Sequence, residues 1–253
     1  MQIGKTIKRA GLESRSELVA FLENLHDVIM SRSGSIVVGQ ALSGKTRSLR
    51  LIQEAYEQLY QEELEQRKEA FHRRKSEVLE ATSAGLSLDL MNTRGAGTLD
   101  IMDVLQGEQQ PNALDLRPEE QVLIRRSCRS KRIVTHIVNP QAQPASAFMG
   151  EIEEKTKEFK DGILASTLRQ IVSSDDGKYQ WIVFDGEVAT EWIEVLNSVL
   201  DDNKKLTLVS GEALPLTPTT RIVIECTDLS KCSPAIISRC GILNMADSVA
   251  SPK

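Results

Sequence analysis

Apolar residues along the chain gather in five short continuous runs. The runs are Ser35–Val38, Ile133–Val138, Trp181–Phe184, Arg221–Cys226 and Gly241–Leu243. Continuous rather than alternating apolar residues are typical of strands that are covered on both faces of a parallel sheet. The pattern therefore predicts a five-stranded, mostly parallel sheet.

Stretches with apolar residues at helical spacing lie between these runs. They are Ser14–Met30, Thr46–Leu59, Asp161–Val172 and Thr190–Leu200. Strands that alternate with helices indicate an α/β domain with a sheet flanked by helices. At 253 residues and 40% hydrophobic content, the chain is long enough to bury one full core of this kind.

One long connection exceeds what such a domain needs. Roughly seventy residues separate the second helix from the strand at Ile133, whereas connections usually have about 2–6 residues. They include the charged run Gln61–Glu80 and a stretch from Gly85 to Pro118 that contains glycine, proline and glutamine. We interpret residues 61–130, approximately, as an insertion. Its charged run either extends the preceding helix into solvent or forms an arm that binds a partner.

A second addition precedes the fourth strand. Leu206–Leu208 reads as a short strand, Ser210-Gly211 as a turn, and Ala213–Leu216 as the returning strand. A glycine-containing turn between two short apolar runs is typical of a hairpin. The sequence therefore predicts an inserted β-hairpin.

Composition narrows the classes of function. The net charge is −5 and the pI is about 5.4, which disfavours a general nucleic-acid binder. No run approaches the roughly 18 apolar residues of a membrane span, so we expect no membrane partner and a cytoplasmic location. The four cysteines show no metal-ligand spacing, which favours reduced, buried thiols.

The first strand is followed by a phosphate-binding motif. The sequence Gly39-Gln40-Ala41-Leu42-Ser43-Gly44-Lys45-Thr46 fits GxxxxGK[ST]. Backbone N–H groups and the N-terminus of the following helix favour an anion at such a loop. We expect Lys45 to reach the phosphates of a nucleotide and the Thr46 hydroxyl to bind Mg²⁺.

The third strand ends in the acidic residue Asp185. A carboxylate at the carboxyl end of a strand beside the phosphate loop is placed to hold Mg²⁺ through water. Gly186 follows, where a hydrolytic glutamate would be expected, and Glu187 comes one residue late. The sequence therefore favours a chain that holds ATP or ADP over one that hydrolyses ATP.

Taken together, these residues resemble an AAA+ module of the dynein heavy chain, most closely the second module of an axonemal-type dynein. The strings that carry the resemblance are Trp181–Gly186, Leu196–Leu206 and Ser233–Gly241. The resemblance implies that residues 1–253 form the large α/β subdomain of a P-loop AAA+ module and that the chain ends before the small helical subdomain.

The resemblance also implies roles for single residues. Asp185 matches the magnesium-supporting aspartate, and Thr227 matches a polar sensor position that is commonly Asn in active modules. Arg239, in the string Ser-Arg-Cys-Gly, matches an arginine finger that acts on the nucleotide of the neighbouring module. Its alternative is a surface salt bridge.

The family implies partners and a location as well. The partners are the neighbouring AAA+ modules of the same heavy chain, with microtubules and dynein intermediate and light chains in the parent complex. The location is the cytoskeleton and the axoneme of the cilium or flagellum. Two other hypotheses remain open: an autonomous P-loop ATPase with Glu187 as base, and an interaction scaffold with a vestigial loop.

Overall fold

The computed structural model describes residues 16–83, 116–153, 155, 158–174, 177–201 and 203–245. Contacts divide the chain into two compact units. The first unit comprises Met1–Tyr56 and Arg132–Lys253, and the second comprises Glu57–Lys131. No helix within the described ranges is long and apolar enough to cross a membrane.

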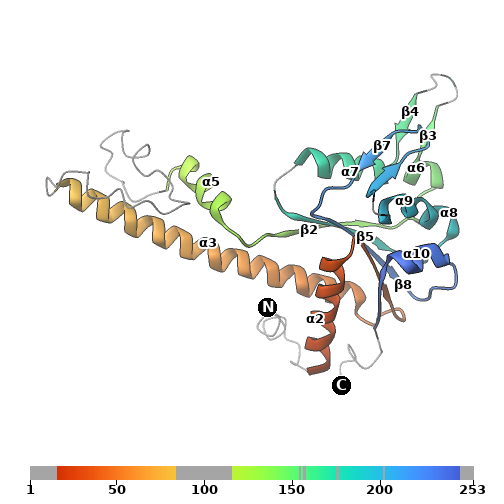
Figure 1. The fold of residues 1–253 in the computed structure, drawn as a ribbon, viewed down its shortest axis with the longest axis horizontal. Coiled ribbons are helices and arrows are strands. Elements are labelled where there is room, and N and C mark those ends of the chain that lie inside the picture. The colour runs from red at the N-terminus through yellow and green to blue at the C-terminus, as the bar shows by residue number, and fades with distance from the viewer. Residues whose placement is uncertain are drawn as a thin grey trace. The chain divides into compact units, whose positions relative to one another are not determined.

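A five-stranded sheet forms the centre of the first unit (Figure 1). Its strands are β1 (Gly34–Val38), β2 (Ile133–Val138), β5 (Tyr179–Asp185), β8 (Thr220–Cys226) and β9 (Gly241–Asn244). Their order in the sheet is β2-β5-β8-β1-β9, and every pair is parallel. The predicted sheet is confirmed, and all its strands run the same way.

One face of the sheet is covered by α2 (Ser16–Ser31) and the first turns of α3 (Lys45–Ser83). Alternate strand residues, such as Val183 and Val223, pack here against apolar side chains of α2, of which Leu25 and Ile29 are fully buried. The buried residues of α2 lie on one face of the helix because they recur at helical spacing in the sequence. Of the predicted helix Ser14–Met30, residues 14 and 15 lie outside the described residues.

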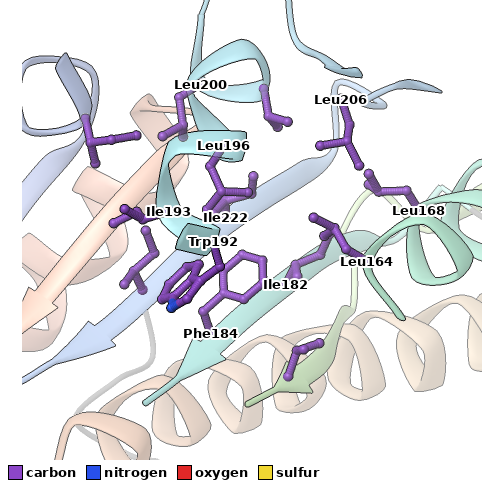
Figure 2. Close-up of a cluster of buried hydrophobic side chains, with 14 of the residues drawn as sticks. Leu164, Leu168, Ile182, Phe184, Trp192, Ile193, Leu196, Leu200, Leu206 and Ile222 are labelled. Carbon is purple, nitrogen blue, oxygen red and sulfur yellow. The ribbon is translucent and has the colours of Figure 1, made fainter. Parts of the chain in front are cut away.

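Shorter helices cover the opposite face, and α7 to α10 lie across the sheet from α2 in Figure 1. They are α6 (Ala145–Met149), α7 (Ile163–Ser174), α8 (Thr190–Ile193), the 3-10 turn η2 (Glu194–Leu196), α9 (Asn197–Leu200) and α10 (Pro234–Arg239). Figure 2 shows Phe184 of β5 beside Trp192 of α8, with ring centroids 5.3 Å apart. The predicted helix Thr190–Leu200 thus consists of three short helical segments.

Two hairpins belong to this unit. The predicted one is confirmed as β6 (Lys205–Thr207) paired with β7 (Ala213–Pro215). The sequence analysis missed the other, in which β3 (Gly150–Ile152) pairs with β4 (Phe159–Asp161). The sequence analysis placed the start of the next helix at Asp161. Because Asp161 instead ends β4, α7 begins at Ile163.

One arginine of α7 binds an acidic residue from each hairpin region. Arg169 donates from Nε to Asp161 Oδ2 at 2.7 Å and from Nη2 to Glu212 Oε2 at 2.6 Å. A planar guanidinium suits two carboxylates at once because its donors are fixed in a fork.

The second unit consists of the α3 residues from Glu57 onward and α5 (Pro118–Ser127). The charged run Gln61–Glu80 does extend the helix that follows the phosphate loop. Only part of this run is exposed to solvent as predicted, because Leu64 and Phe71 are buried against Ile124. The predicted stretch Gly85–Pro118 lies outside the described residues except for its last three positions.

A candidate nucleotide site at the end of the sheet

The phosphate loop leaves β1 at Val38 and enters α3 at Lys45. Gly44 has a φ of 95°, a value that suits glycine, and its carbonyl accepts the first helical hydrogen bond from Ser48 N at 2.9 Å. The N–H groups of Lys45, Thr46 and Arg47 precede Ser48 in the first turn of α3, where N–H groups have no intrahelical acceptor. Together with the positive end of the helix dipole, such free N–H groups favour an anion at this end of α3.

The Lys45 ammonium group lies over this loop. Its Nζ donates to the carbonyl oxygens of Gly39 at 2.7 Å and Gln40 at 2.8 Å. Both bonds stay within the predicted motif, so the loop carries a charged group that is held in place by the loop itself.

A cavity of about 520 Å³ opens beside the loop. A volume of roughly 300–1,000 Å³ is typical of small-ligand sites. The residues that line it come from the loop and from the ends of β5 and β8: Ala41, Leu42, Gly44, Lys45, Thr46, Arg47, Asp185, Gly186, Glu187, Glu225, Cys226 and Thr227. The sequence-predicted residues Lys45, Thr46 and Asp185 are therefore brought together.

Three members of the predicted motif do not line this cavity. Gly39 and Gln40 line a second cavity that also includes Thr227. Ser43 is buried, and its hydroxyl has no hydrogen-bond partner among the described residues.

The cavity lies where parallel α/β sheets usually bind ligands. The chain runs from β1 to the edge strand β2, returns through β5 to β8 beside β1, and then continues to β9 on the other side. This change of direction at the β1/β8 pair creates a crevice at the carboxyl ends of the strands. The sheet order thus places the loop and the end of β8 next to each other.

The residues after β5 differ from a hydrolytic arrangement. Gly186 faces the Asn139 side chain, since a Cβ added to it would lie 3.2 Å from Asn139 Oδ1. Glu187 is exposed, and its Oε2 lies 3.8 Å from Lys231 Nζ. Both residues line the cavity, so the structure places Glu187 near the predicted site without a buried environment that would tune it as a base.

The sequence analysis missed a second carboxylate in the cavity, that of Glu225. Glu225 is 2% exposed, and its Oε2 accepts a hydrogen bond from Thr46 Oγ1 at 2.6 Å. Burial raises the pKa of the Glu225 carboxyl above its ordinary value, although the Thr46 hydrogen bond opposes this effect. A single acidic residue inside the apolar run Ile222–Cys226 was the available signal.

Arg239 stands apart from this cavity. It ends α10, its Nη1 donates to the Ala235 carbonyl at 3.0 Å, and its Nε lies 3.5 Å from Asp201 Oδ1. Within the part of the chain that the structure describes, it is not a lining residue of the cavity. The side chain is 34% exposed.

The cysteines are free thiols in the structure. Cys226, Cys232 and Cys240 are buried as expected, whereas Cys128 is half-buried. Burial raises the pKa of Cys226 and of Cys240 to about 12, so both thiols stay protonated at neutral pH.

Comparisons with known proteins find similarity to part of the chain. Residues 122–240 match the family described as AAA domain (dynein-related subfamily). This range contains Asp185, Gly186, Thr227 and Arg239, whereas the phosphate loop precedes it. The assignment of the loop therefore rests on its motif and geometry.

Three relatives show how far the similarity extends. The chain is 41% identical over 113 residues to the dynein beta chain of the flagellar outer arm of Chlamydomonas reinhardtii, which is 45% of this chain and 2% of that protein. It is 40% identical over 118 residues to human dynein axonemal heavy chain 12, covering 47% and 4%. It is 42% identical over 121 residues to human cytoplasmic dynein 2 heavy chain 1, covering 47% and 3%.

These matches confirm the resemblance to dynein heavy chains, both axonemal and cytoplasmic. The chain spans a few per cent of the length of these relatives, as the three alignments show. The assignment of this chain to the second AAA+ module of a dynein heavy chain stays a prediction.

Proposed function

We propose that this chain, whose residues 122–240 match the dynein-related AAA domain family, is a module that holds ATP or ADP together with Mg²⁺ and has little hydrolytic activity of its own. The observation that carries the proposal is the cavity in which the N-terminal turn of α3, Lys45 and Asp185 meet. A helix N-terminus, an ammonium group and a carboxylate are the groups that a nucleotide and its cation need.

Each residue has a separate part in this function. Lys45 binds the phosphates as a point charge, while Thr46 and Asp185 hold the Mg²⁺. One buried oxygen of Glu225 in the same cavity has no hydrogen-bond partner among the described residues, which supports a hard cation there. Bound Mg²⁺ supplies charge neutralisation at the phosphates. Gly186 offers no carboxylate to activate water, and Thr227 occupies the sensor position.

Arg239 serves a neighbouring module in this proposal. Its separation from the cavity of its own chain supports a role on another nucleotide, and its partial exposure leaves the guanidinium accessible. A guanidinium at a phosphoryl group being transferred is worth roughly 10³–10⁵ in rate in other systems.

The parent protein that we propose is a dynein-type heavy chain. In that heavy chain, other AAA+ modules would lie next to this one. The complex would move on microtubules and contain intermediate and light chains. It would act in the cytoplasm or in the axoneme. We propose no nucleic-acid or membrane partner. The names of the relatives, which include flagellar, axonemal and cytoplasmic dyneins, support this proposal.

The test is calorimetric titration of ADP into the wild-type chain and into Lys45→Ala. Removing a charge-assisted interaction worth about 1.5–3 kcal/mol weakens binding roughly 10- to 150-fold. Lys205→Ala, at an exposed position of β6, is the matched control and should bind like the wild type. An unchanged affinity in Lys45→Ala would mean that the loop is vestigial.

A second candidate function is an autonomous ATPase that uses Glu187 as base. The observation that favours it is that Glu187 lines the cavity. We expect ATP turnover at background in the wild type. Turnover of about 1 s⁻¹, at the low end of typical enzymes, that disappears in Glu187→Gln would favour this candidate over ours.

A further inference from the structure

Glu225 is a buried carboxylate with one oxygen left over. Its Oε2 accepts from Thr46, and its Oε1 is buried without a hydrogen-bond partner among the described residues. A carboxylate in this position is costly unless a donor or a cation satisfies it. Lys45 Nζ does not supply that donor: its hydrogen bonds run to the carbonyls of Gly39 and Gln40, and Oε1 stays without a partner among the described residues.

The strand register places Glu225 beside Asp185. The two residues are partners across the parallel pair β5 and β8. Each lies two positions beyond a valine, Val183 or Val223, that faces α2 and α3. Since side chains alternate along a strand, both carboxylates belong to the face on which α3 begins, the face that carries Thr46.

We propose that Glu225 is a second acidic residue of the cation site, which holds Mg²⁺ together with Thr46 and Asp185. This inference rests on the proposed function, because the cation accompanies the nucleotide. Glu225 Oε2 accepts a hydrogen bond from the Thr46 hydroxyl, so the lone pairs of that hydroxyl stay available to the cation, and Glu225 Oε1 supplies a further oxygen donor. Two carboxylates and a hydroxyl form the oxygen donor set that Mg²⁺ prefers.

Besides offering Oε1 to the cation, Glu225 has the role of a positioning residue. It acts through the Thr46 hydroxyl, which it already binds at 2.6 Å, and through the charge that it adds to Asp185. Residues that orient a metal ligand in this way typically contribute about 10- to 100-fold to metal affinity. The alternative is a neutral, protonated carboxyl with a purely structural role, and Glu225→Gln imitates that neutral group.

The experiment compares ADP binding with Mg²⁺ and in EDTA by calorimetry. It uses the wild type, Glu225→Gln, and Glu191→Gln, an exposed glutamate of α8 outside the cavity. We expect Glu225→Gln to lose about tenfold or more of the affinity that Mg²⁺ adds, with ADP binding in EDTA unchanged. Glu191→Gln should keep the full Mg²⁺ effect.

Glu225→Asp keeps the test decisive if the glutamine variant is unstable. The aspartate retains the charge but has a shorter reach, so we expect part of the Mg²⁺ effect to return. A Mg²⁺ effect equal to that of the wild type in a folded glutamine or aspartate variant would overturn the proposal, as would an equal loss of affinity with Mg²⁺ and in EDTA.

Mn²⁺ binding to the nucleotide-free chain, followed by electron paramagnetic resonance, separates this inference from the proposed function. If ADP fails to bind to the wild type even in EDTA, the proposed function fails. Mn²⁺ that is bound by the wild type and lost in Glu225→Gln would still support the cation site. Equal Mn²⁺ binding by both proteins, or none by the wild type, would overturn it.

Discussion

Glu63 joins α3 to the segment that follows α5, and its replacement gives a quantitative test of the second unit. Its Oε2 accepts from the backbone N–H of Ser130 at 2.7 Å, and its Oε1 accepts from that of Arg129 at 2.9 Å. Arg67, one turn along the helix, donates to the same carboxylate at 3.1 Å. Glu63→Gln removes the charge and presents an amide N–H₂ to one of these donors.

The pKa of Glu63 provides the magnitude. Burial alone raises the pKa of this carboxyl, but the hydrogen bonds from Arg129, Ser130 and Arg67 outweigh it and lower the value from 4.5 to about 2. Such a difference is equivalent to about 3 kcal/mol of stability in the ionised form. Because the side chain is 20% exposed, solvent screens part of this, and we expect Glu63→Gln to cost about 2 kcal/mol.

Amide hydrogen exchange at Arg129 and Ser130 measures this loss directly. A cost of about 2 kcal/mol at pH 7 speeds local exchange roughly 30-fold. The difference from the wild type should shrink as the pH falls from about 4.5 to about 2, because protonation of Glu63 in the folded state removes the same contribution. Glu65→Gln is the control, since Glu65 is 61% exposed and pairs with Lys68 at the surface. Equal exchange in both variants would refute the reasoning.

Three further substitutions test other parts of the structure. Leu42 has a φ of 65° and is fully exposed, so Leu42→Gly should raise the melting temperature through about 0.5–1 kcal/mol of relieved strain, and a fall would contradict this. Gly162→Ala would place a Cβ 2.3 Å from the Gly150 nitrogen and should cost more than about 3 kcal/mol in chemical denaturation; a neutral result would show that the hairpin shifts freely. Arg239→Ala should change the stability of this chain by less than about 0.5 kcal/mol, yet slow ATP hydrolysis at the neighbouring module of the parent; full ATPase activity in that parent would return Arg239 to the surface salt bridge with Asp201.

Local signals in the sequence were sufficient for the sheet and the loop. The strands read as continuous apolar runs because both faces of a parallel sheet are covered, and β1 and β8 indeed contribute to both cores. The phosphate motif was recognisable because glycine spacing, Lys45 and Thr46 stand within eight consecutive positions. The position of Asp185 followed from its place at the end of an apolar strand.

Features that depend on distant residues were out of reach of this reasoning. The hydrogen bond between Thr46 and Glu225 joins residues 179 positions apart, so no local sequence pattern predicts it. The hairpin of β3 and β4 has strands of three residues each, too short for a period of two to stand out. The two ends of this hairpin approach each other closely because Gly150 and Gly162 carry no Cβ, and both read in sequence as ordinary turn residues.

The hydrogen bonds from Lys45 to Gly39 and Gln40 have a kinetic consequence. An ammonium group has three hydrogens and these two carbonyls take two of them, so the third stays available to a phosphate at the loop. Because these bonds already hold the ammonium group at the loop, phosphate binding needs little further ordering of the Lys45 side chain. A phosphate can therefore meet Lys45 already in place, and association should not require either internal bond to break first.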